Sequence, residues 1–102
     1  MSIRTYLPEI ECLVRPGNDN RVLVTLTDTE AGEHQLAVVH DFVNHHEGKC
    51  WLPVQVLVFD FDRQRALIDL PGTSESGITR LWIPLNYFRP SPEKSLEPAA
   101  AS

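Results

Sequence analysis

The sequence predicts a single, mostly antiparallel all-β domain, a small barrel of five to six strands with at most one short helix. Short runs in which apolar and polar residues alternate recur along the chain. Clusters of Gly, Pro, Asn and Asp separate these runs about every eight to twelve residues, a spacing typical of barrels and sandwiches. With 102 residues, the chain is long enough for one core and too short for two.

Three strands are expected in the first forty residues or so. Glu9–Arg15, Arg21–Thr27 and Gln35–Val39 each carry apolar residues at alternate positions. The turn-forming sequence PGNDN ends the first of these strands. The sequence DTEAGE between the second and third is expected to be a hairpin loop, with Gly32 supplying a positive φ.

One segment, Asp41–His46, has a pattern compatible with a helix. Asp41 could cap its start and Gly48 could end it, although the segment is too short to be a stable helix by itself. Lys49–Leu52 resumes extended structure, and Pro53 marks a sheet edge or a bend.

The second half contains a hairpin and a closing strand. Val54–Phe59 and Ala66–Leu70 are joined through the polar sequence DFDRQR, and Ile78–Ile83 follows a Pro-Gly-Ser loop. Apolar residues on both faces of the first of these strands predict a central strand that is covered on both sides. The domain is expected to span residues 1–90. Residues 91–102 contain one large apolar residue, Leu96, and are expected to be a disordered tail.

The alternation also predicts the core. The inward positions of each strand are occupied by aliphatic residues, and the central hairpin leaves two neighbouring candidates open. The expected buried residues are Val22, Val24, Leu26, Leu36, Val38, Val56, Val58, either Leu67 or Ile68, Leu81 and Ile83.

Charge and cysteine content limit the function classes. The net charge of −5 counts against general binding to nucleic acids or anionic membranes, because an acidic chain repels polyphosphates. The N-terminal sequence has no secretory or transmembrane pattern, so the expected compartment is the cytoplasm, without membrane contact. Cys12 and Cys50 are therefore expected to be free core thiols, and a Cys12–Cys50 bridge between neighbouring strands is the alternative.

The segment Ile83-Pro84-Leu85-Asn86-Tyr87-Phe88 follows a hairpin and a loop. This order resembles the second half of a Src-homology-3 domain, which implies a small barrel closed by a one-turn 3₁₀ helix. In that family the proline and tyrosine line a groove for polyproline-II peptides, so the resemblance implicates Pro84, Asn86 and Tyr87. The groove tryptophan of the family aligns with Ala66, which leaves at most half a groove. The whole pattern also resembles small bacterial proteins, which implies no activity.

Catalytic and metal constellations are weak. His34, His40, His45 and His46, with Cys50, lack the spacing of zinc ligands and are expected to be surface histidines near a turn. Asp60, Asp62 and Asp69 are expected to be solvated and paired with arginines, rather than acid–base catalysts. Ser74 and Ser76 lack a nucleophile motif. We therefore expect neither an enzyme nor a cofactor.

The remaining candidate is an aromatic and basic cluster in the closing segment. Leu81 and Ile83 should point inward, which leaves Trp82 beside Arg80 on an outer face, where an amphipathic tryptophan is typical of a protein interface. The alternatives are plain packing under Trp51 or the Asp41–His46 segment, and a nucleic-acid or ribosome-associated barrel that uses Arg80, Trp82 and Arg89. The sequence thus favours an interaction module, with a protein partner or a second copy on a Trp82/Pro84/Tyr87 face. The predicted binding residues are Arg80, Trp82, Pro84, Asn86, Tyr87 and Arg89.

Overall fold

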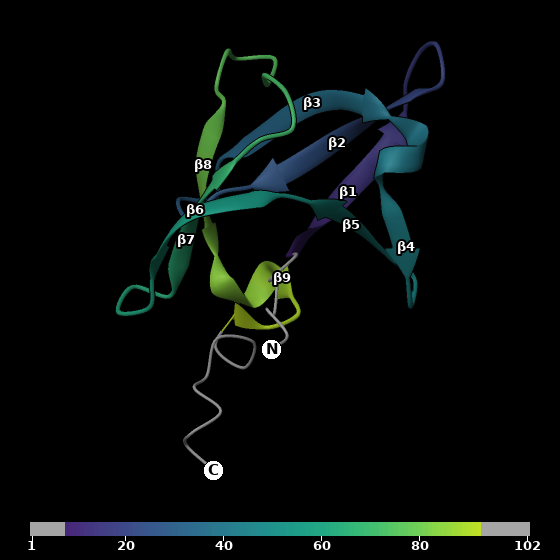
Figure 1. Cartoon of the computed structure of the whole chain (residues 1–102). Coiled ribbons are helices and arrows are strands. Elements are labelled where there is room, and N and C mark those ends of the chain that lie inside the picture. Colours follow the sequence, from purple (N-terminus) through teal and green to yellow (C-terminus); the bar gives the residue numbers. More distant parts are fainter. Residues whose placement is uncertain (1–7, 93–102) are drawn as a thin grey trace, which may run out of the picture.

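Residues 8–92 are described by a computed structural model, and they form nine strands and two 3₁₀ turns (Figure 1). The strands are β1 (Glu9–Pro16), β2 (Arg21–Thr27), β3 (Glu33–Val39), β4 (Asn44–His46), β5 (Lys49–Pro53), β6 (Gln55–Asp60), β7 (Arg65–Asp69), β8 (Arg80–Pro84) and β9 (Phe88–Arg89). The 3₁₀ turns are η1 (His40–Phe42) and η2 (Leu85–Tyr87). The predicted tail lies almost entirely outside the described residues. Over residues 8–92, no helix has the length and apolar character that a bilayer crossing requires.

The strands form two antiparallel sheets, which confirms the all-β, antiparallel prediction. The larger sheet has the order β3-β2-β1-β5-β4, and β9 also pairs with β1. The smaller sheet has the order β6-β7-β8. The described strands exceed the predicted five to six, and they form open sheets instead of a closed barrel. Two strands that were not predicted, β4 and β9, have only three and two residues, too few to show an alternating pattern.

The segment Asp41–His46, which was compatible with a short helix, forms no α-helix. Its first part is the three-residue turn η1, and its last part is strand β4. Gly48 ends no helix; with Glu47 it forms the two-residue turn between β4 and β5, and both residues have positive φ (52° and 78°). Two successive positive φ values match the right-handed twist of a tight hairpin, so the glycine specifies a turn between strands.

In the loop between β2 and β3, the residue with a left-handed backbone is not the predicted one. Ala31 has the positive φ of 63°, and Gly32 does not. The Asp28 carboxylate instead organises the loop, because it accepts hydrogen bonds from the backbone N–H groups of Glu30 and Gly32 and contacts His34 Nε2 at 2.7 Å. A Cβ atom at Gly32 would lie 2.9 Å from Asp28 Oδ2, so the glycine permits this close approach.

The core consists of side chains from the facing sides of the two sheets. Eight of the predicted positions are buried: Val22, Val24, Leu26, Leu36, Val38, Ile68, Leu81 and Ile83. Val56 is half-buried and packs against this core. The sheet pairing adds core residues that were not predicted, among them Ile10, Leu52, Ala66 and Phe88.

The predicted burial of Val58 is wrong, because its side chain is 48% exposed. A β-bulge between Val56 and Val58 inserts Leu57 into β6 as an extra residue. Since side chains alternate strictly along a strand, one inserted residue moves every later side chain to the other face. Phe59 therefore packs against the core in the place that alternation gave to Val58.

Candidate functional site

The outer face of the β6-β7-β8 sheet carries a continuous row of apolar side chains. Val58 pairs with Leu67, and Leu67 pairs with Trp82, so the three lie side by side across the sheet. The bulge adds Leu57 beside Val58, and both are well exposed (38% and 48%). We call Leu57, Val58, Leu67 and Trp82 the apolar stripe. No described strand covers it, which corrects the prediction that this hairpin is covered on both sides.

Two ion pairs flank the apolar stripe. On one side, Arg80 Nε lies 3.6 Å from Asp69 Oδ1, and on the other, Arg65 Nε lies 3.2 Å from Asp60 Oδ2. The four charges cancel, so the face around the apolar stripe has no net charge from these residues. An apolar centre within a charged rim is the usual composition of a protein–protein interface.

Trp82 is held in place from two directions. The Arg65 guanidinium carbon lies 4.0 Å from the centre of the indole ring, a cation–π contact. The Trp82 carbonyl accepts a hydrogen bond of 3.0 Å from the backbone N–H of Thr29, which ties β8 to the loop between β2 and β3. Trp82 is therefore a half-buried side chain in a fixed position, as a preorganised contact residue would be.

The structure brings together three of the six predicted binding residues. Arg80, Trp82 and Pro84 follow one another at alternate positions of β8, on the outer face. Asn86 and Tyr87 belong to η2, where Asn86 is exposed. Tyr87 packs against the core and lines a separate hollow of about 180 Å³ beside β1 and β2. Trp82 and Tyr87 thus do not form one ledge.

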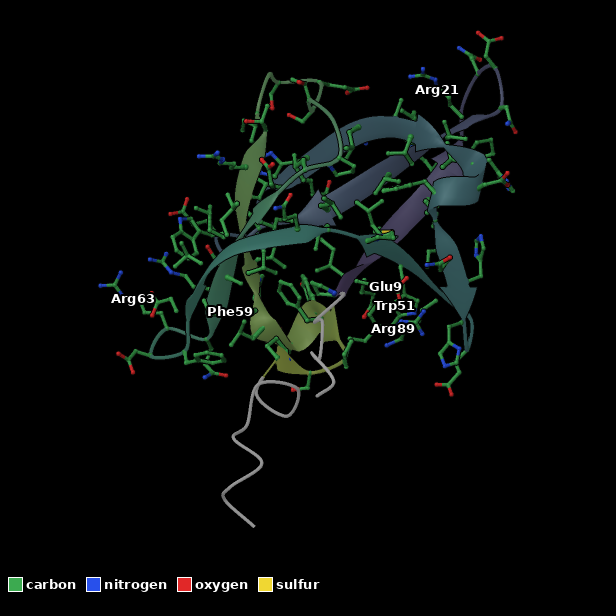
Figure 2. All side chains as sticks on the ribbon, in the orientation of Figure 1. Glu9, Arg21, Trp51, Phe59, Arg63 and Arg89 are labelled. Atoms are coloured by element: carbon green, nitrogen blue, oxygen red, sulfur yellow. The ribbon has the colours of Figure 1, made fainter. Side chains whose placement is uncertain are left out.

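The sixth residue, Arg89, lies against the larger sheet. Its guanidinium carbon is 4.5 Å from the Trp51 ring centre, and its Nε is 3.0 Å from Glu9 Oε1 (Figure 2). Asn44 donates a hydrogen bond to the same carboxylate. Sequence reasoning missed this cluster because the cluster depends on strand pairing. Strand β1 pairs with both β5 and β9.

Other sequence candidates have structural roles. Ser74 is buried and its Oγ accepts the backbone N–H of Ile78, which shapes the loop before β8. His34 is mostly buried against Asp28, which corrects the expectation of a surface residue. His40, His45 and His46 are exposed. Among residues 8–92, no three His, Cys, Asp or Glu side chains are grouped so as to hold a metal ion.

Comparisons of the chain with protein-family models, with curated proteins and with solved structures found no significant match.

Proposed function

We propose that this protein is a non-enzymatic interaction module whose contact surface is the outer face of the β6-β7-β8 sheet. The observation that carries the proposal is the apolar stripe, which crosses all three strands and includes a tryptophan in a fixed position. Tryptophan and arginine are enriched among the residues that dominate binding energy at protein interfaces. Burying the stripe would remove apolar area from water while the flanking ion pairs stay at the rim.

The occupant that we propose is a second copy of the chain. On β7, the residues two positions before and after Leu67 carry opposite charges. Asp69 lies on one side of the apolar stripe and Arg65 on the other. If two copies pack face to face about a two-fold axis along the stripe, Trp82 meets its counterpart and Asp69 faces Arg65 of the other copy. The face is therefore complementary to itself, as a two-fold dimer interface must be.

The nucleic-acid alternative receives no support from the positions of its residues. It required Arg80, Trp82 and Arg89 on one basic face, whereas Arg89 lies on the larger sheet beside Glu9. Arg80 also has a carboxylate partner, Asp69. A groove for single-stranded nucleic acid needs net positive charge along the phosphates, and this face is balanced.

We also propose that the second half is arranged like a Src-homology-3 domain. The order of its elements supports this: the β6-β7-β8 meander is followed by η2, and then by β9, which returns to pair with β1. Ala66 is fully buried and leaves the polyproline groove without its aromatic wall. The apolar stripe, on the outer side of the meander, is for this reason the better contact surface.

The test is sedimentation velocity of the full chain over a concentration series. We expect reversible dimers. Val58→Asp should raise the dimer dissociation constant by at least about tenfold, which corresponds to losing ~1.4 kcal/mol at a central contact. Leu13→Asp is the matched control, because Leu13 is even more exposed (67%) but lies on β1 of the other sheet. A chain that stays monomeric throughout, or equal effects of both variants, would contradict the proposal.

Fluorescence gives a second readout of the same surface. The chain has two tryptophans, so Trp51→Phe leaves Trp82 as the single emitter. We expect its emission maximum to move to shorter wavelength as dimers form, because the indole leaves water. The charge-reversed variant Asp69→Arg should abolish this shift, and adding Arg65→Asp in the same chain should partly restore it. If dimers form without any shift, the interface lies elsewhere.

A further inference from the structure

A row of cysteine and histidine side chains lies on the larger sheet, away from the apolar stripe. Cys12 of β1 pairs with Cys50 of β5, and Cys50 pairs with His45 of β4, so the three residues form one row across neighbouring strands. Both cysteines are free thiols. Cys50 Sγ lies 3.4 Å from His45 Nδ1, which is hydrogen-bond distance for sulfur. A histidine at this distance can take the thiol proton and generate the nucleophilic thiolate.

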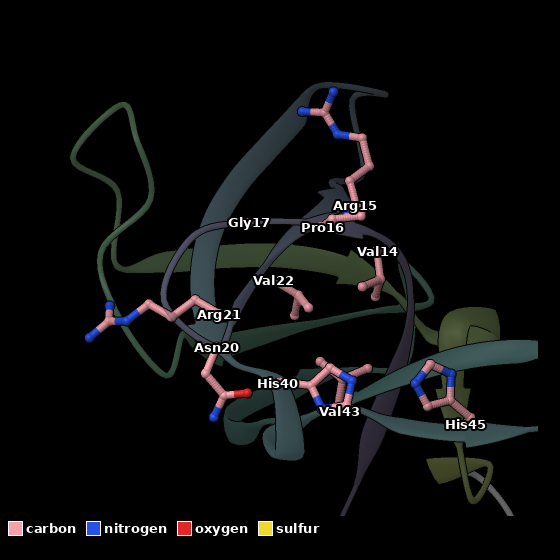
Figure 3. Close-up of a pocket in the computed structure, with 10 residues that line it drawn as sticks. All are labelled: Val14, Arg15, Pro16, Gly17, Asn20, Arg21, Val22, His40, Val43 and His45. Atoms are coloured by element: carbon pink, nitrogen blue, oxygen red, sulfur yellow. The ribbon is translucent and has the colours of Figure 1, made fainter.

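An open pocket of about 340 Å³ adjoins this row. Figure 3 shows its lining: Val14, Val22 and Val43 supply apolar side chains, and the His40 and His45 rings lie beside them. Arg15 and Arg21 extend from the rim, and none of the lining residues is acidic. In a chain with a net charge of −5, this lining combines apolar side chains with basic ones.

His45 connects the pocket to the thiols, because it both lines the pocket and contacts Cys50. The two thiols differ in environment. Cys12 is buried, and burial together with the neighbouring Cys50 and Glu11 raises its pKa to about 12, so it stays protonated and unreactive near neutral pH. Cys50 is half-buried at the margin of the core. The structure therefore contains a reactive candidate and an internal unreactive reference.

We propose that Cys50 is a thiol-modification site that undergoes exchange with small anionic disulfides admitted through this pocket. The Cys50 thiol passes its proton to His45, and the thiolate attacks one sulfur of the disulfide. A new S–S bond joins Cys50 to one half of the reagent while the reagent's own S–S bond breaks, and the other half leaves as a thiolate. Cys50 is oxidised, the released half is reduced, and no other oxidant is required.

The experiment uses dithiobis(nitrobenzoate), an aromatic disulfide with a carboxylate on each half, and the folded full chain. We expect one rapid equivalent of released thiolate per chain and, by mass mapping of the unmutated protein, the label on Cys50. Cys50→Ser should remove the rapid phase, and Cys12→Ala should keep it. Label on Cys12, or two rapid equivalents, would overturn the proposal.

Matched variants separate the histidine from its surroundings. His45→Gln should slow the reaction by about tenfold, because the thiol loses its proton acceptor. His46→Gln is the control, since His46 is adjacent on β4 but lies near Glu47 instead of the thiol. Equal rates for the two histidine variants would show that His45 does not activate Cys50.

The contribution of the pocket is measured with a second reagent. The double variant Arg15→Gln/Arg21→Gln should slow the reaction with dithiobis(nitrobenzoate) severalfold, because the attraction of its carboxylates is lost. The reaction with the uncharged dithiodipyridine should keep its rate. Arg63→Gln, on the distant β6-β7 hairpin, is the control for overall charge. The basic rim plays no part in admitting the disulfide if the double variant lowers the reaction rates of both reagents equally. The same conclusion follows if Arg63→Gln lowers the rate as much as the double variant does.

Discussion

Replacing Ile83 by Ala should lower the free energy of unfolding by about 3 kcal/mol, whereas Val58→Ala should lower it by less than ~1 kcal/mol. Ile83 is completely buried between the two sheets, so its truncation loses apolar burial and leaves a cavity. Val58 is 48% exposed, and the atoms that it would lose already contact water. Urea unfolding, followed by circular dichroism, gives both values.

This pair of variants tests the β-bulge at Leu57 directly. Both side chains are aliphatic residues of the smaller sheet, and strict alternation would bury both. If Val58→Ala destabilised the protein as much as Ile83→Ala, the register of β6 after Val56 would be wrong. The loss of about 3 kcal/mol is a large share of the stability of a domain this small, so the Ile83 variant should melt at a clearly lower temperature.

Asp28→Asn should destabilise the protein by about 2 kcal/mol at neutral pH and flatten the decline of stability in acid. The contact with His34 and the backbone N–H groups of Gly32 and Glu30 lower the pKa of Asp28 below its ordinary value of 3.8, against the opposing effect of burial. A carboxyl whose pKa is lower in the folded state stabilises the fold above the unfolded pKa. That stabilisation is lost as the pH falls through the folded pKa.

Urea unfolding at neutral pH and at several values below pH ~4, where unfolded carboxyls take up protons, measures this effect. Asp62→Asn is the matched control, since Asp62 is exposed on the β6-β7 hairpin and should change little. Parallel pH profiles for the wild type and the Asp28 variant would refute the role given to Asp28. The variant also tests the loop itself, because an amide cannot accept the same set of hydrogen bonds as strongly as a carboxylate.

The strands with long alternating patterns could be predicted from sequence, and β2 was predicted with its observed bounds, Arg21–Thr27. Such strands bury one face, so the pattern records the fold directly. The bulge could not be predicted, because VQVLVFDF alternates equally well in either register. The turn at Glu47–Gly48 was interpreted as a possible helix end, because a glycine is typical of that position as well as of a hairpin turn.

The candidate site was predicted only in part, because alternation within one strand shows in the sequence and pairing between strands does not. The outward position of Trp82 beside Arg80 follows from alternation within one strand, and the structure has both residues on that face. Leu67 and Val58 join them only through pairing with neighbouring strands, which a single sequence does not reveal. Arg89 was placed with Trp82 because the two are close in sequence, but the 3₁₀ turn η2 redirects the chain to the other sheet before β9.

The pairing of β1 with β9 has a consequence for how the protein is made. Glu9 and Arg89 are register partners, so the first described strand is completed by the last one. During synthesis, the β6-β7-β8 meander can form as soon as its own residues are available, because its contacts are local. The pairing of Glu9 and Ile10 with β9 must wait for the end of the domain. We therefore expect a nascent chain to hold its first strand incompletely paired until almost the whole domain has left the ribosome.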